Sequence, residues 1–165
     1  SFDVIKSGRK NMRNDVENII KEFHLDRKRI FEVSKFKYAS IIHQIEKTFV
    51  KNGQHIHWSN MGNGFQSQWS CIYKDISQQM NWYHLLPQII LDNKEPIYVL
   101  FEDTVDYQPK YWVYEMYIPE LIVVIDNSNP DDFYLVSKKY DWLISECHEE
   151  VVCFLGDKLN YQVIK

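Results

Sequence analysis

Apolar residues recur three or four positions apart in the N-terminal third of the chain. This spacing predicts a helix over about 12–24, with Asn11 or Asn14 as its cap. The apolar face of this helix consists of Val16, Ile19, Ile20 and Phe23. The same spacing predicts a second helix over about 38–49, which Asn52-Gly53 ends, and "RIFEVS" between the two predicts a short strand. Both helices carry lysines and arginines on their polar faces, so the amphipathic pattern accounts for them without a ligand.

The middle of the chain gives weaker patterns. Asparagines and glycines over 60–64 indicate a turn, with short strands around 55–58 and 68–73. The next segment, "NWYHLLPQII", is typical of an aromatic helix. Pro87 must lie in the first turn of that helix or kink it, because proline lacks the N–H that an interior position needs.

The pattern changes to strands after Asn93. Four runs rich in β-branched and aromatic residues predict strands, namely "PIYVLFED", "KYWVYEMY", "ELIVVID" and "DFYLVS". "KKYDWLISEC" then predicts a short helix with Tyr140, Leu143 and Ile144 on one side, and "EVVCFLG" predicts a last strand. We therefore expect an α+β fold, with N-terminal helices first and a largely antiparallel sheet of about five strands that carries its helices on one face.

Length and composition fit one domain over residues 1–165. The chain has 45% hydrophobic and 15% aromatic residues, and no repeat or Pro/Gly linker divides it. Its three cysteines show no CxxC spacing, and the sequence contains no signal-peptide pattern and no long apolar span. These features favour the cytoplasm and argue against a membrane protein. The first residue is Ser1 rather than Met, which leaves open the removal of a leader.

Charge divides this domain into two parts. A basic helical part, about 1–52, precedes an acidic strand-rich part, about 53–165. Residues 1–51 contain 12 Lys and Arg against 7 Asp and Glu, whereas residues 52–165 contain 7 against 16. Eight of the acidic residues fall between Glu102 and Asp132, where Lys110 is the one basic residue. The negative charge of this region argues against a nucleic-acid ligand and favours a basic protein partner.

Two acidic turns form the candidate binding surface. If consecutive strands form hairpins, the turns at 102–109 and 126–132 lie at the same end of the sheet, because two chain reversals separate them. Carboxylates there would supply charge and aromatic side chains would supply apolar anchors. The predicted partner-binding residues are Glu102, Asp103, Asp106, Tyr107, Trp112, Asp131 and Asp132.

Catalytic and metal-binding motifs are weak by comparison. The carboxylates lack EF-hand spacing, and His55 and His57 share one side of a strand without an evident third zinc ligand. Cys147 and His148 are adjacent, whereas catalytic Cys/His pairs are normally distant in sequence. We therefore predict no enzyme, cofactor or metal. Two alternatives stay open. One is a small-ligand or metal-dependent enzyme with a pocket lined by Trp58, Trp69, Trp82 and the nearby histidines, and the other is a subunit of a larger assembly. The oligomeric state is open as well.

Three segments carry a resemblance to known proteins. "WYHLLPQII", "PIYVLFED" and "DDFYLVSKKYDWLISE" resemble segments of small uncharacterised bacterial proteins, and the layout over about 80–155 is similar to that of immunity proteins of polymorphic or contact-dependent toxins. Immunity proteins share no catalytic residues, and each neutralises one toxin by tight binding, often with an acidic surface over a basic nuclease site. The resemblance implies a stoichiometric protein inhibitor and assigns no residue a role.

Overall fold

The computed structural model describes residues 11–50, 55–57, 60–61, 71–76 and 78–164. Within these residues, seven strands form one sheet in the order β1-β4-β3-β5-β6-β7-β2, and every neighbouring pair is antiparallel. The strands are β1 Ile30–Glu32, β2 Cys71–Asp75, β3 Ile97–Val105, β4 Gln108–Met116, β5 Asp132–Ser137, β6 Trp142–Glu146 and β7 Val151–Gly156. The fold is α+β with an antiparallel sheet, as the sequence predicts, but the sheet has more strands than the expected five or so.

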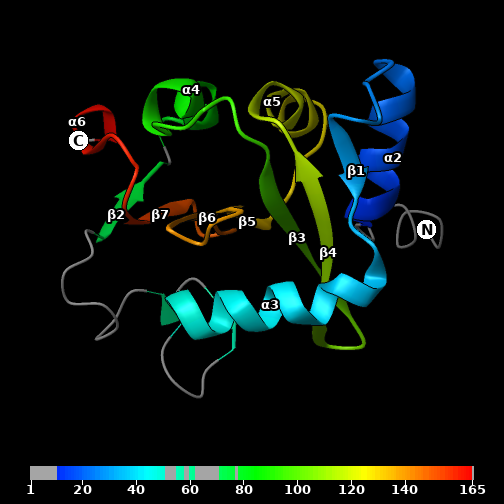
Figure 1. The fold of residues 1–165 in the computed structure, drawn as a ribbon, viewed down its shortest axis with the longest axis horizontal. Coiled ribbons are helices and arrows are strands. Elements are labelled where there is room, and N and C mark those ends of the chain that lie inside the picture. The colour runs from blue at the N-terminus through cyan, green and yellow to red at the C-terminus, as the bar shows by residue number, and fades with distance from the viewer. Residues whose placement is uncertain (1–10, 51–54, 58–59, 62–70, 77, 165) are drawn as a thin grey trace.

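Helices cover both faces of this sheet (Figure 1). The helices are α2 Met12–Glu22, α3 Lys35–Phe49, α4 Leu86–Ile89, α5 Ile118–Asp126 and α6 Tyr161–Ile164, and a 3-10 turn, η2 Trp82–Leu85, leads into α4. Figure 1 shows α3 on one side of the sheet and the other four helices on the opposite side. The expected helix-first order is confirmed. The expectation that all helices lie on one face is wrong.

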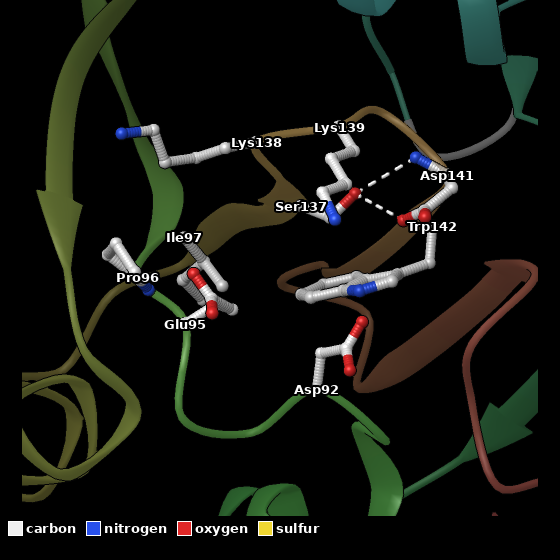
Figure 2. A pocket seen from close by; sticks show the side chains of 9 residues that line it. All are labelled: Asp92, Glu95, Pro96, Ile97, Ser137, Lys138, Lys139, Asp141 and Trp142. Atoms are coloured by element: carbon white, nitrogen blue, oxygen red, sulfur yellow. Dashed lines mark hydrogen bonds between the residues drawn. The ribbon is translucent and has the colours of Figure 1, made fainter.

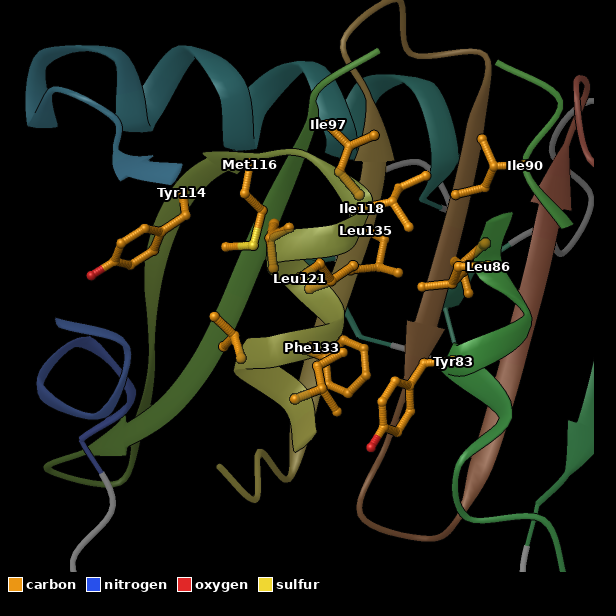
Figure 3. Packing of buried hydrophobic residues seen from close by; sticks show 14 of the residues in the cluster. Tyr83, Leu86, Ile90, Ile97, Tyr114, Met116, Ile118, Leu121, Phe133 and Leu135 are labelled. Atoms are coloured by element: carbon orange, nitrogen blue, oxygen red, sulfur yellow. The ribbon is translucent and has the colours of Figure 1, made fainter. Parts of the chain in front are cut away.

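One buried cluster fills the space between the sheet and the four helices (Figure 3). Phe133 and Leu135 point from β5 toward Leu121 of α5, and Phe101 of β3 and Tyr114 of β4 belong to the same cluster. The apolar stripes of α2, α4 and α6 join the same cluster. Large aromatic side chains at this interface bury the area that drives a domain of this size to fold.

A second buried cluster lies under α3. Ile41, Ile45 and Phe49 of α3 pack against Tyr134 and Leu143 of the sheet. This cluster exists because β5 and β7 are buried at nearly every position, and so present apolar side chains on both faces. A strand of that kind needs cover on both sides. This physical reason explains why the one-face prediction fails.

The N-terminal elements and the proline-containing helix follow the sequence predictions. Asn11 caps α2, and its side-chain oxygen accepts the backbone N–H of Asn14 at 3.1 Å. β1 and α3 also form where the pattern indicates them. Pro87 lies in the first turn of α4, where its missing N–H is not needed.

The segment "ELIVVID", predicted as a strand, is helix α5. Its side chains at helical spacing are buried, namely Ile118, Leu121, Val124 and Ile125, and Pro119 lies in the first turn. Ser128 closes the C-terminal end by donating its hydroxyl to the carbonyl of Val124 at 2.7 Å. A short, continuous apolar run fits a buried helix as well as a buried strand, and packing decides between them.

The opposite error occurs at "KKYDWLISEC", which was predicted as a helix. Residues Trp142–Glu146 form β6, and Tyr140 has a φ of 57°, which a helix does not contain. Most of β6 is buried, so the strand lacks the alternation of apolar and polar residues that would reveal it. Among the described residues 55–57 no strand forms, and β2 begins at Cys71. Residue 58, residues 68–70 and Asn52-Gly53 lie outside the described part of the chain.

Two further findings concern the whole described chain. No helix within it combines the length and the apolar character needed to cross a membrane. The side chains of Cys147 and Cys153 are buried.

Helix α3 offers a direct test of the second cluster, because it contains one buried and one exposed phenylalanine. Phe49 is 0% exposed and Phe36 is 99% exposed. We expect Phe49→Ala to lower the free energy of unfolding by about 3–5 kcal/mol, and Phe36→Ala to change it by less than about 0.5 kcal/mol. Denaturant unfolding of both variants measures this. Similar values for the two would contradict the placement of α3.

Candidate functional site

Three chain segments meet at one end of the sheet. Glu102 of β3 lies opposite Asp132 of β5, and Phe133 lies opposite Glu146 of β6. The segments 102–107, 126–132 and 146–150 are therefore neighbours, and together they contain nine carboxylates and no lysine or arginine. We call these three segments the acidic end. The first two share an end as the sequence predicts, although α5 makes one of the reversals that a strand was expected to make.

The β3–β4 hairpin projects furthest at the acidic end. Its two strands pair with each other as far as Val105 and Gln108, whereas the pairing of β3 with β5 stops at Glu102. Asp106 and Tyr107 form its two-residue turn with φ values of 51° and 64°. Two positive φ values match a type I′ turn, which normally takes asparagine and glycine. Tyr107 is 98% exposed, so neither burial nor backbone preference accounts for a tyrosine at this tip.

Glu102 and Asp132 form a like-charge pair across neighbouring strands. Glu102 is half-buried, and its pKa is raised first by burial and then by the nearby Asp132 carboxylate. Tyr134 offsets part of this cost, because its hydroxyl donates to Glu102 Oε1 at 3.3 Å. Burial and the Glu102 carboxylate also raise the pKa of Tyr134, which keeps that hydroxyl a donor. The pair therefore concentrates negative charge at a small cost in stability.

His148 ties the β6–β7 turn to Asp132. Its backbone N–H donates to Asp132 Oδ1 at 3.2 Å, and its Nδ1 lies 3.1 Å from Oδ2. The hydrogen bond and the charge of Asp132 raise the pKa of His148. Glu149 and Glu150 follow in the same turn and are exposed. The turn thus adds two solvent-facing carboxylates beside Asp132.

Aromatic donors hold two more carboxylates at the acidic end. Trp82 donates its indole N–H to Glu146 Oε1 at 2.6 Å, while burial and neighbouring carboxylates raise the pKa of Glu146. Asp126 accepts the hydroxyl of Tyr83 and lies 2.7 Å from His84 Nε2. These hydrogen bonds lower the pKa of Asp126. Both carboxylates are therefore fixed in position.

Two of the predicted binding residues are committed to internal contacts. Asp103 is 6% exposed, and its Oδ2 accepts the backbone N–H of Met12 at 2.9 Å and the indole N–H of Trp112 at 2.6 Å. Asp103 thereby caps the start of α2. Trp112 is half-buried, and the amino groups of Lys35 and Lys110 lie 5.7 Å and 5.2 Å from its ring centre. These two residues support the hairpin, whereas Asp106, Tyr107 and Asp131 are exposed and Glu102 and Asp132 half-buried.

Sequence reasoning missed the third segment of the acidic end. Residues 146–150 were assigned in part to a helix, which concealed the turn. The available signal was "ECHEE", a polar stretch between the apolar runs "WLIS" and "VVCFL", which is typical of a hairpin. Glu150 adopts a φ of 63° in this turn.

The chemistry of the described residues centres on charge. No group of three or more His, Cys, Asp or Glu side chains among them is arranged to hold a metal ion. His55 and His57 are exposed, and His55 Nδ1 lies 3.7 Å from Glu46 Oε2. Of the tryptophans in the alternative pocket, Trp82 is buried in the core, and Trp58 and Trp69 lie outside the described residues.

Comparison with known proteins places the chain in a family. The model of the family of unknown function DUF6756 matches residues 8–165. No curated protein and no solved structure matches the chain.

Replacement of Glu102 by glutamine should stabilise the protein at neutral pH. The pKa of Glu102 is raised in the folded state, so the folded protein binds a proton at this side chain more tightly than the unfolded chain does. The resulting contribution to the free energy of unfolding is complete below the unfolded-state pKa and is lost as the pH rises through the folded-state pKa. At pH 7 we expect Glu102→Gln to raise the free energy of unfolding by roughly 0.2–1 kcal/mol, because it removes one charge of a like-charge cross-strand pair. The gain should shrink toward pH 4. Glu115→Gln, which breaks the 2.8 Å pair with Lys138, is the control and should not stabilise.

Replacement of Tyr107 by glycine tests the turn geometry. Glycine adopts positive φ without the steric cost that a tyrosine side chain carries, which is about 1 kcal/mol per residue. We expect Tyr107→Gly to keep or raise the midpoint of thermal unfolding, although it deletes a large aromatic side chain. A decrease of more than about 1 kcal/mol in the free energy of unfolding would mean that the Tyr107 side chain stabilises the fold.

Proposed function

The chain belongs to the DUF6756 family, and we propose that it is a protein-binding inhibitor that neutralises a basic protein partner. In this proposal the acidic end docks on the partner, with exposed carboxylates around the aromatic tip formed by Tyr107. The partner is of the toxin or nuclease type, as for immunity proteins, and the setting is the bacterial cytoplasm. The protein acts by stoichiometric binding and catalyses no reaction.

One observation carries this proposal: the acidic end combines nine carboxylates, no lysine or arginine, and a fully exposed tyrosine. Folding explains Asp103, which caps α2, but it does not explain why the other eight carboxylates gather here, since like charges repel, or why a tyrosine stands at a positive φ. Binding explains them together. A carboxylate field speeds the approach of a basic partner, and tyrosine is a common anchor residue of protein interfaces.

The arrangement of the carboxylates supports a preformed surface. Asp132, Glu146 and Asp126 are held by His148, Trp82 and the Tyr83–His84 pair. Their side chains therefore lose little conformational freedom on binding, which lowers the entropic cost of association. The exposed Asp106, Glu149 and Glu150 at the rim are suited to steering rather than to tight contacts. The buried free thiol of Cys147 suits a reducing compartment.

Affinity capture with charge-matched variants tests the proposal. Tagged protein is exposed to native lysate at low salt, and proteins eluted by salt are identified and then titrated in purified form. We expect a basic partner in 1:1 ratio whose activity is lost on binding. Glu149→Gln with Glu150→Gln should slow association about three- to tenfold at low salt and reduce its salt dependence.

The control variant removes the same two charges elsewhere. Glu22→Gln with Asp157→Asn changes exposed carboxylates outside the acidic end and should leave association within about twofold. Tyr107→Gly should speed dissociation of the same partner while the fold stays intact. Equal effects of the two charge variants, or a partner that remains fully active in the complex, would refute the proposal.

A further inference from the structure

One histidine lies among the carboxylates of the acidic end. The segments 102–107, 126–132 and 146–150 contain His148 and no other residue that can carry a positive charge. His148 lies in the β6–β7 turn, and its side chain is 57% exposed. A histidine side chain changes its charge between about pH 5 and pH 8. Within these segments, the presence of any positive charge therefore depends on this one ring.

The carboxylate of Asp132 is the main partner of the His148 ring. Nδ1 of the ring lies 3.1 Å from Asp132 Oδ2 and 3.3 Å from Oδ1. The backbone N–H of His148 also donates to Oδ1 at 3.2 Å, and this hydrogen bond does not depend on the charge of the ring. Asp132 lies opposite Glu102 on the neighbouring strand. A proton on His148 is therefore placed beside a like-charge pair of carboxylates.

Other carboxylates around the ring favour its protonated form. His148 Nε2 lies 3.9 Å from Glu149 Oε1. The hydrogen bond and the charge of Asp132 raise the pKa of His148, and the charges of Glu149 and Asp131 add to this effect. Burial and the charge of Asp132 raise the pKa of Glu102, whereas the charge of His148 opposes that rise. The charge of His148 is thus coupled to both members of the like-charge pair.

Strand β2 ends beside the same turn. The Ile76 N–H donates to the Glu150 carbonyl at 2.9 Å, and Asp75 lies opposite Val151. The amino group of Lys74 is directed elsewhere, because it donates to the carbonyl of Ile164 at 2.9 Å. Next to His148, burial raises the pKa of the Cys147 thiol, which therefore stays uncharged at neutral pH. Within the described part of the chain, the charged side chains around the β6–β7 turn are therefore carboxylates.

We propose that proton uptake by His148 switches partner binding at the acidic end, an inference that rests on the proposed function. With a neutral ring, the carboxylates present their full negative charge to a basic partner. With a protonated ring, Asp132 is paired within the protein, and the new positive charge repels the cations of the partner. The affinity therefore falls as the pH drops through the range in which His148 takes up its proton. Because the two equilibria are linked, a bound basic partner also makes His148 harder to protonate.

Isothermal titration calorimetry with a capped hexalysine peptide tests this switch. The peptide keeps its charge between about pH 5.5 and pH 8, so a change in Kd across this range comes from the protein. Protons taken up by Glu102, Glu146 and His84 also weaken binding, but they do so with and without the His148 ring. His148→Gln removes the charge of the ring and keeps the backbone hydrogen bond to Asp132. We expect the rise in Kd from about pH 8 to about pH 5.5 to be about three- to tenfold larger in the wild-type protein than in His148→Gln.

The matched control removes a histidine outside the acidic end. His43 is exposed on α3, and His43→Gln should keep the wild-type pH dependence within about twofold. Equal pH dependence of the wild-type protein and His148→Gln, an equal effect of His43→Gln, or no binding of hexalysine at about pH 8 would overturn the switch.

The outcomes also separate the switch from the proposed function. A pH dependence of hexalysine binding that His148→Gln abolishes supports the switch, and failure to capture a basic partner would then refute the inhibitor function alone. Capture of a basic partner whose Kd shows the same pH dependence with the wild-type protein and with His148→Gln would refute the switch alone.

NMR titration of the His148 ring in the free protein tests the contact on which the switch depends. Asp132→Asn removes the carboxylate that stabilises the protonated ring, so the midpoint of the His148 titration should move to lower pH. Glu115→Gln removes a carboxylate that is paired with Lys138 and should leave that midpoint in place. An unchanged midpoint in Asp132→Asn would overturn the inference.

Discussion

Burial of the central strands on both faces is the constraint on which the rest of this structure depends. β5 and β7 are buried at nearly every position, so apolar side chains point both toward α5 and toward α3. Each large apolar side chain removed from water stabilises the fold by roughly 1.5–3 kcal/mol. If either face of the sheet stayed open to solvent, this stabilisation would be lost for several side chains at once. Helices must therefore pack on both sides, and α3 forms the cover of one face alone among the described helices.

This cover decides where polar chemistry can occur. With both faces closed, the charged loops lie at the two ends of the strands. One end gathers the β3–β4, α5–β5 and β6–β7 connections, and with them the nine carboxylates of the acidic end. The other end holds the β5–β6 turn and a small pocket beside it (Figure 2). The position of the proposed protein-binding surface thus follows from this architecture.

The sequence predicts part of this arrangement and misses part of it for physical reasons. β3 and β4 could be found because they are bounded by clear turn residues, and α2 could be found because its apolar stripe is regular. The types of α5 and β6 are predicted the wrong way round, since the short buried apolar runs 121–125 and 142–144 carry no periodicity that distinguishes helix from strand. A helix reverses the chain as a strand does, so Glu102 and Asp132 still meet. The error at β6, by contrast, hid Glu149 and Glu150, and charge patterns alone could not reveal that Asp103 is buried as the cap of α2.

Hydrogen–deuterium exchange of the protein with its captured partner tests the central claim most directly, because it reports where the partner binds. The account predicts that backbone protection on binding centres on 102–107, 126–132 and 146–150, with little change in α3 or in the β5–β6 turn. Protection confined to α3, or to the end of the sheet that carries the β5–β6 turn, would contradict a partner surface at the acidic end.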